Sequence, residues 1–274
     1  MIVEPMFTQE GDAFIPHPHT DSGWPVPTMH GGAVAGLLAH ALESQRDEQA
    51  LMPARLMVDL LKPVPRAPLR VTTSVVRSSR RIKLVDAVLL QGDTVLVRAS
   101  ALFLRREEGG QSEALGTSAV IPPMESVPPL HWAKGAPIAI FHHLAEVRRV
   151  NDWHRNEPLI AWARFPAPLL PGKPLTPFER SAVLSDFANV MGTLTQTDEA
   201  KGFINADITL RLVREPVGEW MCIEVVARAD SGGIALSSVH LYDQQGFVGH
   251  AAVTCIENRL PDRVMPETLR AQGL

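Results

Sequence analysis

The run from Gly31 to Leu42 constrains the fold of this chain more than any other segment. Its sequence is GGAVAGLLAHAL, in which His40 is the one polar side chain. A surface helix carries a single apolar stripe, whereas a helix that is apolar on every side is buried. We therefore expect a central helix over residues 31–45 that other elements surround.

The start of this helix has the features of a binding site for a partly negative oxygen. Its first turn offers free backbone N–H groups and the positive end of the helix dipole. Gly31 and Gly32 would let a ligand oxygen approach these groups closely. His30 comes directly before them. We expect it to cap the helix, with a contact to substrate as the alternative.

After Pro53 the pattern changes to strands. Segments rich in Val, Leu and Thr show partial alternation with a period of two. In the first half, strands are predicted at 55–61, 69–77, 81–91 and 94–105. In the second half they are predicted at 142–150, 159–165, 206–214, 219–228, 234–243 and 247–256. A second helix is expected from Pro177 to about Thr195, because Thr176 and Glu179 match a capping box with proline at the first helical position.

The two halves therefore repeat one order, a helix followed by strands, which indicates a duplicated unit. We divide the chain into an N-terminal domain (1–107), a proline-rich linker (108–140), a C-terminal domain (141–260) and a tail (261–274). A flat sheet cannot surround a helix. Each half is thus predicted to be a strongly curved antiparallel sheet wrapped around its helix.

Composition argues against several classes of protein. The net charge of −4 provides no attraction for nucleic acid or an anionic membrane, so neither partner is expected. Cys222 and Cys255 lack metal-type spacing, which favours core positions in a reduced, cytoplasmic protein. The chain begins with acidic residues, unlike a signal peptide. The apolar part of 22–42 is too short to span a bilayer.

Two pairs of histidines are candidate metal ligands. His17 and His19 lie close in sequence, and His142 and His143 are adjacent. Neither pair has further ligands at a useful spacing, so we expect no metal site.

Three segments resemble the double hot-dog acyl-CoA thioesterases, the acyl-CoA thioesterase II type and its thioesterase-like relatives. They are Met29-His-Gly-Gly32 with the small apolar helix after it, Ser185-Asp-Phe-Ala-Asn189, and Arg214-Glu-Pro-Val-Gly-Glu-Trp220 with the strands that follow. The resemblance covers roughly residues 10–258. It implies an α+β fold of two tandem hot-dog domains, each a curved antiparallel sheet wrapped around a central helix.

Asp186 is the predicted catalytic residue. It lies among mainly apolar or small neighbours, where a charge is costly unless it is paired or functional. The resemblance implies that Asp186 activates a water as general base or attacks the thioester itself. The alternative is a carboxylate that binds a neighbouring backbone group or faces solvent.

The N–H groups of Gly31 and Gly32 would stabilise the oxygen that gains charge during attack. Alternatively, the two glycines only permit a tight turn and close packing. Asn189, one helical turn after Asp186, is expected to orient that carboxylate or to hold the water.

In the family that this chain resembles, the aspartate works with a Thr and a Gln on later strands. The corresponding places here fall near Asn205 and Thr254, and neither residue matches. Their amide and hydroxyl groups are predicted to bind the catalytic water instead.

The predicted reaction is hydrolysis of an acyl-CoA thioester to a free carboxylic acid and coenzyme A, as part of fatty acid metabolism. It needs no metal and no cofactor beyond the coenzyme A of the substrate. One alternative is a non-catalytic acyl-binding protein, which the unmatched Thr and Gln positions favour. Another is an enoyl-CoA hydratase, whose Asp-x-Asn-Pro-x-His segment is missing from this chain. A homodimer is expected as well.

Overall fold

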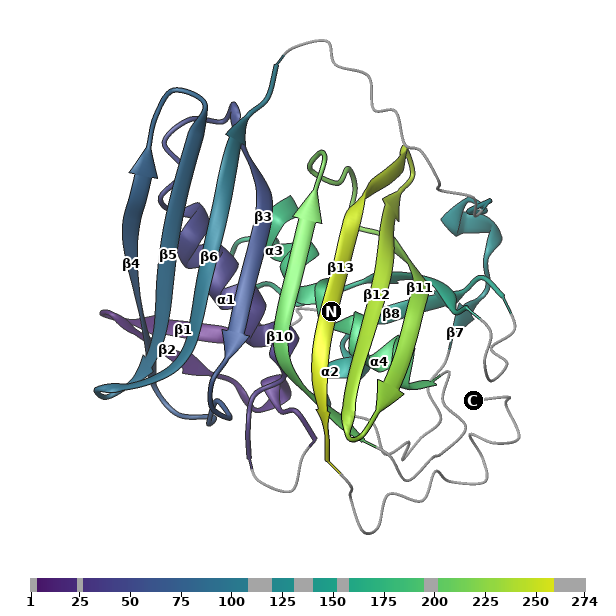
Figure 1. Ribbon diagram of the computed structural model, residues 1–274, viewed down its shortest axis with the longest axis horizontal. Helices are drawn as coiled ribbons and strands as arrows, with labels where there is room; N and C mark the ends of the chain where they lie inside the picture. The colour runs from purple at the N-terminus through teal and green to yellow at the C-terminus, as the bar shows by residue number, and fades with distance from the viewer. Residues whose placement is uncertain are drawn as a thin grey trace.

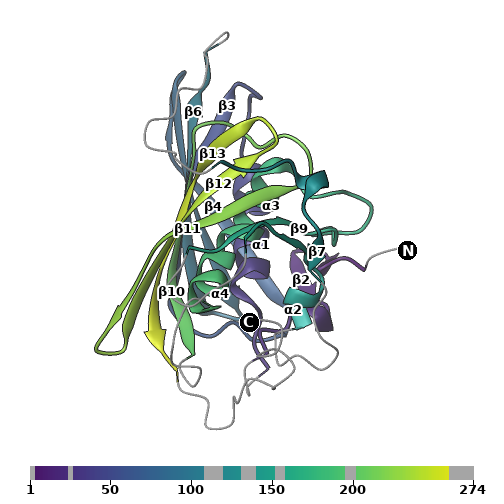
Figure 2. The ribbon, with the colours of Figure 1, turned by 90° about the vertical axis from the view of Figure 1, so that its right-hand side faces the viewer.

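The computed structural model describes residues 4–23, 27–107, 120–130, 140–151, 158–194 and 202–258. The predicted tail and parts of the predicted linker lie outside these residues. Figure 1 shows a continuous sheet that runs across both halves of the molecule. In Figure 2 the long helices lie together on one side of that sheet.

The N-terminal half contains the long helix α1 (Gly31–Glu43) and the short 3-10 helix η1 (Pro18–Thr20). Its strands are β1 (Phe7–Glu10), β2 (Ala13–Pro16), β3 (Leu51–Leu60), β4 (Leu69–Ser78), β5 (Ile82–Gln91) and β6 (Thr94–Arg105).

The C-terminal half contains η2 (Met124–Ser126), α2 (Ile140–His143), α3 (Pro177–Ser185) and α4 (Phe187–Leu194). Its strands are β7 (Pro129–Leu130), β8 (Glu146–Arg149), β9 (Ile160–Arg164), β10 (Phe203–Leu212), β11 (Met221–Ser231), β12 (Ile234–Asp243) and β13 (Gly246–Glu257).

The order of the strands shows the duplication directly. The sheet runs β1-β2-β4-β5-β6-β3-β10-β13-β12-β11-β9-β8-β7, so that β4-β5-β6-β3 is mirrored by β11-β12-β13-β10. The halves join where β3 pairs antiparallel with β10, with Leu56 opposite Leu210. Two equivalent units thus share one sheet and a pseudo-two-fold axis, as the repeated order of elements predicts.

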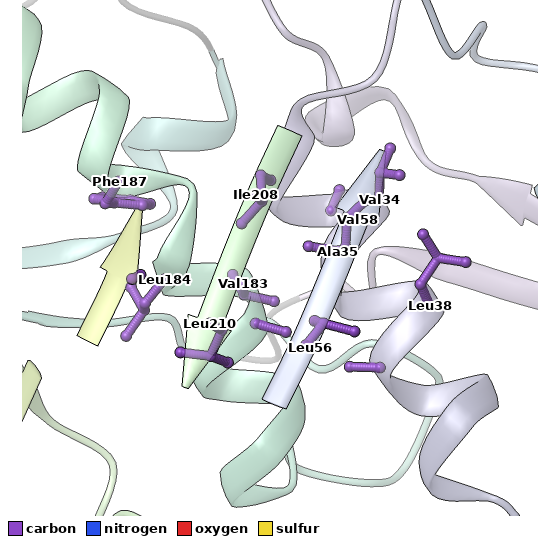
Figure 3. Packing of buried hydrophobic residues seen from close by; sticks show 14 of the residues in the cluster. Val34, Ala35, Leu38, Leu56, Val58, Val183, Leu184, Phe187, Ile208 and Leu210 are labelled. Atoms are coloured by element: carbon purple, nitrogen blue, oxygen red, sulfur yellow. The ribbon is translucent and has the colours of Figure 1, made fainter. Parts of the chain in front are cut away.

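Helix α1 is buried on nearly every side, which confirms the expectation from its sequence. Val34, Leu37 and Leu38 are at most 1% exposed. Fully burying a leucine contributes about 1.5–3 kcal/mol, so this helix anchors the core. Figure 3 shows Val34 and Leu38 in the same cluster as Leu56 of β3. Among the described helices, none is both long and apolar enough to cross a bilayer.

The helices of the two halves also touch each other. A Cβ added to Gly36 of α1 would lie 2.7 Å from Val183 Cγ2 of α3. Only glycine therefore permits this distance between the helices. The halves are joined by helix packing on one side of the sheet as well as by the β3–β10 pair within it.

The predicted single helix after Pro177 is wrong, because it breaks at Asp186. Helix α3 ends at Ser185 and α4 begins at Phe187. The Asn189 N–H donates to the Asp186 carbonyl at 3.1 Å, a tight three-residue step that starts the second helix. The break changes the direction of the chain at the residue with the candidate catalytic carboxylate.

The predicted strand at 142–150 is shorter than expected. His142 and His143 belong to α2, and β8 begins only at Glu146. Phe141 is fully buried and its ring stacks on Phe165 at 4.5 Å, which holds this turn of helix against the core. Strand β7, within the predicted linker, pairs with β8 at the edge of the sheet.

Candidate active site

The candidate site lies where the two halves meet. Asp186, at the break between α3 and α4, faces the start of α1 and is only 4% exposed. A Cβ added to Gly31 would overlap Asp186 Oδ1. A glycine at the start of α1 is therefore necessary for the carboxylate to come this close to the backbone. The structure brings together Asp186 and the glycine pair, which are more than a hundred residues apart in sequence.

Three groups surround the carboxylate of Asp186. Oδ1 accepts a hydrogen bond from Asn205 Nδ2 at 2.5 Å, and Oδ2 lies 3.1 Å from His30 Nδ1. The Gly32 backbone N–H also bonds to it. Burial raises the pKa of Asp186 to about 6, although the bonds from Asn205 and Gly32 act in the opposite direction. This carboxyl group therefore changes charge just below neutral pH.

His30 caps α1, as the sequence predicts, and it also contacts Asp186. Its Nδ1 accepts from the Gly32 N–H at 3.1 Å. Burial lowers the pKa of His30 to about 3, so its ring is neutral. Because Nδ1 of this neutral ring is an acceptor, the contact with Asp186 is a hydrogen bond when the carboxyl group carries the proton. It is not an ion pair.

Asn205 is placed at the site by an irregularity in β10. The pairing of β10 with β13 shifts between Asn205 and Asp207, and Asn205 stands opposite Cys255. The Cys255 Sγ–H donates to Asn205 Oδ1 at 3.1 Å. Because the amide oxygen is occupied by this bond, the amide nitrogen faces Asp186. Cys255, which the sequence indicated only as a core residue, thus orients Asn205.

The prediction of Thr254 in the site is wrong. Thr254 is exposed on the opposite face of β13, because successive side chains on a strand point to opposite faces. Its backbone N–H donates to Asp207 Oδ1 at 2.5 Å. The position one residue later, Cys255, is the one that faces the core.

Asn189 does not orient Asp186 through its side chain. Its Nδ2 donates to the Phe203 carbonyl at 3.0 Å, and its Oδ1 accepts from Thr193 at 3.3 Å. These bonds fasten α4 to the start of β10. The expectation that Asn189 orients Asp186 is therefore wrong, whereas its expected contact with the catalytic water stays a prediction.

Two residues close to His30 carry no sequence pattern that marks them. His142 Nε2 lies 2.7 Å from His30 Nε2, and the His30 ring stacks on Phe141 at 4.3 Å. The sequence distinguishes His142 only as one of two adjacent histidines. Its partner is 112 residues away in sequence, so no local signal could reveal the contact.

The position related to the Asp186 site by the pseudo-two-fold axis holds a different set of groups. His40 is the tenth residue of α1, and Asp186 is the tenth position counted from the start of α3, directly after the last residue of that helix. His40 Nδ1 bonds to Glu179 Oε1 at 2.7 Å. Glu179 also accepts from the Thr176 N–H in a complete capping box. This contact fastens the two helices, and α3 begins without a glycine pair.

A loose cluster of possible metal ligands lies elsewhere in the described parts of the chain. The ligand atoms of Glu4, His17 and His19 come within 4.8 Å of one another. Glu4 is missing from the sequence prediction because it lies 13 positions before His17. However, His17 Nε2 is already bonded to the Thr8 hydroxyl at 2.8 Å, and Glu4 is exposed. We assign no metal to this cluster.

The fold and the site together define a class. A buried carboxylate with a pKa of about 6 faces helix N-terminal amides where the helices of the two halves meet beside one shared sheet, which suits an enzyme that attacks a carbonyl carbon. Residues 20–104 match the acyl-CoA thioesterase N-terminal domain, and residues 123–256 match the acyl-CoA thioesterase C-terminal domain. The chain therefore belongs to the acyl-CoA thioesterase family, an enzyme family of thioester hydrolases.

Solved structures support the fold. A hot-dog protein of unknown function from Alicyclobacillus acidocaldarius matches with a TM-score of 0.71 and 19% identity, over 93% of this chain and 96% of that one. The tesB protein of Mycobacterium avium subs paratuberculosis has a TM-score of 0.71 and 14% identity, over 92% and 95%.

The acyl-CoA thioesterase II TesB2 from Mycobacterium marinum has a TM-score of 0.68 and 17% identity, over 93% of this chain and 96% of that one. Among curated proteins, none matches the sequence. The predicted α+β tandem hot-dog fold is confirmed.

Proposed function

We propose that this protein hydrolyses an acyl-CoA thioester to a carboxylic acid and coenzyme A, with Asp186 as the general base. The observation that carries this proposal is the position of Asp186 against the first turn of α1. Burial raises the pKa of Asp186 to about 6. A base is most effective when its pKa lies near the working pH, because it is then both ionised and basic enough.

In the proposed reaction the thioester carbonyl lies over the start of α1, and a water lies between it and Asp186. Asp186 takes a proton from the water as its oxygen attacks the carbonyl carbon. The carbonyl oxygen gains negative charge, which the N–H groups of Gly31 and Gly32 stabilise. The Gly32 N–H already bonds to His30 Nδ1 at 3.1 Å. The incoming oxygen would therefore share or replace that bond.

Asn205 has a supporting role in this proposal. Its amide holds Asp186 Oδ1 at 2.5 Å, which leaves the carboxylate one preferred orientation toward the water. The reaction requires no metal and no cofactor other than the coenzyme A of the substrate. A direct attack by Asp186 on the thioester is an alternative first step. Incorporation of oxygen-18 from labelled water into Asp186 during a single turnover would reveal it.

An enoyl-CoA hydratase on the same fold is the second candidate. The specific observation in its favour is the contact between His30 Nδ1 and Asp186 Oδ2 at 3.1 Å, because hydration of a double bond needs an adjacent acid and base. A binding protein without activity is the third candidate, favoured by the full engagement of Asp186 with Asn205, His30 and Gly32.

Thiol release from short, medium, long and aromatic acyl-CoAs tests the three candidates together. We expect release by the wild type and a loss of at least about a hundredfold in Asp186→Asn, the usual scale for a general base. Asp93→Asn, in the exposed turn between β5 and β6, is the matched control. Equal turnover in Asp186→Asn would contradict the proposal. Hydration of an enoyl-CoA without thiol release would favour the hydratase. Binding of an acyl-CoA without either reaction would favour the binding protein.

We also propose that the protein acts in the cytoplasm, as a homodimer, in fatty acid metabolism. Cys222 and Cys255 are both free and buried, which suits a reducing compartment. Ile204, Ile234 and Ile256 stand next to one another across β10, β13 and β12 on the exposed face of the sheet. A second copy of the chain would cover this apolar strip. Sedimentation velocity of the wild type beside Ile256→Glu tests the dimer.

A further inference from the structure

Asp186, His30 and His142 form a continuous line of side chains from the candidate site outward. Asp186 Oδ2 lies 3.1 Å from His30 Nδ1, and His30 Nε2 lies 2.7 Å from His142 Nε2. Asp186 and His30 are 4% and 6% exposed, whereas His142 is only half-buried. The line therefore connects a buried carboxylate to the surface through two imidazole rings.

Packing holds both rings in this arrangement. The His30 ring lies flat on Phe141, with centroids 4.3 Å apart and 15° between the ring planes. The His142 ring contacts Phe187 edge-on at 5.5 Å, next to Asp186 in the chain. Phe141 is fully buried against Phe165. These contacts fix the direction of each ring, so the nitrogen atoms cannot easily turn away from one another.

Hydrolysis requires two proton transfers at this site. The base receives a proton when water attacks, and the sulfur of the departing thiol must gain one. Asp186 has little contact with solvent of its own, and an acyl-CoA over the start of α1 would cover it further. We propose that His30 and His142 carry protons between Asp186 and solvent during the reaction, a role that rests on the proposed thioester hydrolysis.

The proton transfers balance over one turnover. Attack of water forms a C–O bond, and the proton lost by the water goes to Asp186. Asp186 passes a proton to His30 Nδ1, the Nε2 proton of His30 moves to His142 Nε2, and His142 releases its other ring proton to solvent. When the C–S bond breaks, a proton returns along the same line to Asp186 and then to the thiolate. The products are the carboxylic acid and the thiol, and both rings regain their starting forms.

The resting hydrogen bonds match the first transfer. His30 Nδ1 accepts from the Gly32 N–H, so the neutral ring carries its proton on Nε2. That Nε2–H points at His142 Nε2, which accepts it at 2.7 Å. His30 is thus ready to receive a proton on one nitrogen and to release one from the other. Two neutral imidazole rings are a normal means of moving protons near neutral pH.

Two substitutions of His142 separate transfer from packing. His142→Gln retains an amide oxygen that can accept from the His30 Nε2–H but cannot exchange protons, whereas His142→Ala leaves space for added imidazole. We expect His142→Gln to lower kcat by about ten- to a hundredfold and to leave KM unchanged. Loss of a general acid or base usually lowers the rate by about a hundredfold or more, so this effect is at or below the lower end of that range. Imidazole in the buffer should restore turnover to His142→Ala and have no effect on His142→Gln.

His143 provides a control, and His30, the cap of α1, provides a second test. His143 lies next to His142 on α2 and is exposed, so His143→Gln is expected to keep the wild-type kcat. His30→Asn replaces the histidine by another residue that caps helices well, and it should lower kcat while the protein stays folded.

Wild-type kcat in His142→Gln, or failure of imidazole to restore His142→Ala, would overturn the relay. The proposed hydrolysis would survive that result if Asp186→Asn remained inactive. No thiol release by the wild type from any acyl-CoA would overturn both proposals. As a measurement independent of turnover, ring nitrogen-15 NMR should show the His30 proton on Nε2 and a coupling across the bond to His142. A His30 proton on Nδ1, without that coupling, would contradict the resting arrangement.

Discussion

Replacement of Asp186 by Asn should stabilise the folded protein at neutral pH while it removes the activity. Burial raises the pKa of Asp186 from 3.8 to about 6. Between these two values the folded protein holds a proton that the unfolded chain has already released. The free energy of unfolding therefore falls as the pH rises through this window, and the full cost of the charge is present above it. Asn carries no charge at any pH and avoids this cost.

The magnitude follows from the size of the shift. A difference of about two pKa units corresponds to about 3 kcal/mol, which is the largest gain expected for Asp186→Asn at pH 7. The amide also fits the site. Its oxygen can accept from Asn205, and its nitrogen can donate to His30 Nδ1, which lies 3.1 Å from the present Oδ2. The gain should shrink toward zero as the pH falls to about 4 and below, because Asp186 is then protonated in the unfolded chain as well as in the folded protein.

Urea unfolding of both proteins over a range of pH measures this effect. The stability difference should grow by roughly 1 kcal/mol between pH 5 and pH 7, as the integrated linkage relation requires. Asp93→Asn removes a carboxylate from an exposed turn and should show no such trend. If Asp186→Asn were no more stable than the wild type at pH 7, or if its gain did not depend on pH, burial would not be the cause of the raised pKa.

Three further predictions concern the rate of thioester hydrolysis. The kcat should rise with pH to a plateau, with an apparent pKa of about 6 for Asp186, and Asn205→Ala should move this limb to higher pH because the bond from Asn205 lowers that pKa. Thr254→Ala should keep the wild-type kcat, whereas Cys255→Ala should lower it, since Cys255 orients Asn205; equal effects would contradict this assignment. Gly31→Ala should lower kcat with little change in secondary structure by circular dichroism, because its Cβ would displace the Asp186 carboxylate.

Much of the fold could be predicted from local pattern. The all-round apolar character of α1 requires burial whatever surrounds it, and Val34, Leu37 and Leu38 are buried as expected. The duplication was visible because equivalent elements follow one another in the same order in each half. The sheet order that joins β3 to β10 could not be predicted, because pairing between distant strands produces no pattern in the sequence of either strand.

Errors in the predicted site have local physical causes. Thr254 and Cys255 are neighbours on β13, and successive side chains of a strand point to opposite faces. An error of one residue in the predicted position therefore selects an exposed side chain where a buried one belongs. The break at Asp186 was hidden, because the sequence around it is compatible with a continuous helix. The contact between His30 and His142 joins residues 112 positions apart and depends on the placement of the short helix α2.

The sequence by itself determined the buried helix and the repeat of helix and strands, and its resemblance to the thioesterases predicted Asp186 and the glycine pair as candidate site residues. These depend on residue type and spacing along the chain, which hydrophobicity, helix capping and backbone sterics convert into local structure. Only the tertiary structure decided which groups surround Asp186. Asn205, His30 and His142 come from a strand, a helix cap and a short helix in different parts of the chain. Asn205 and His142 belong to the same half as Asp186, whereas His30 reaches Asp186 and His142 only because the two halves pack against each other.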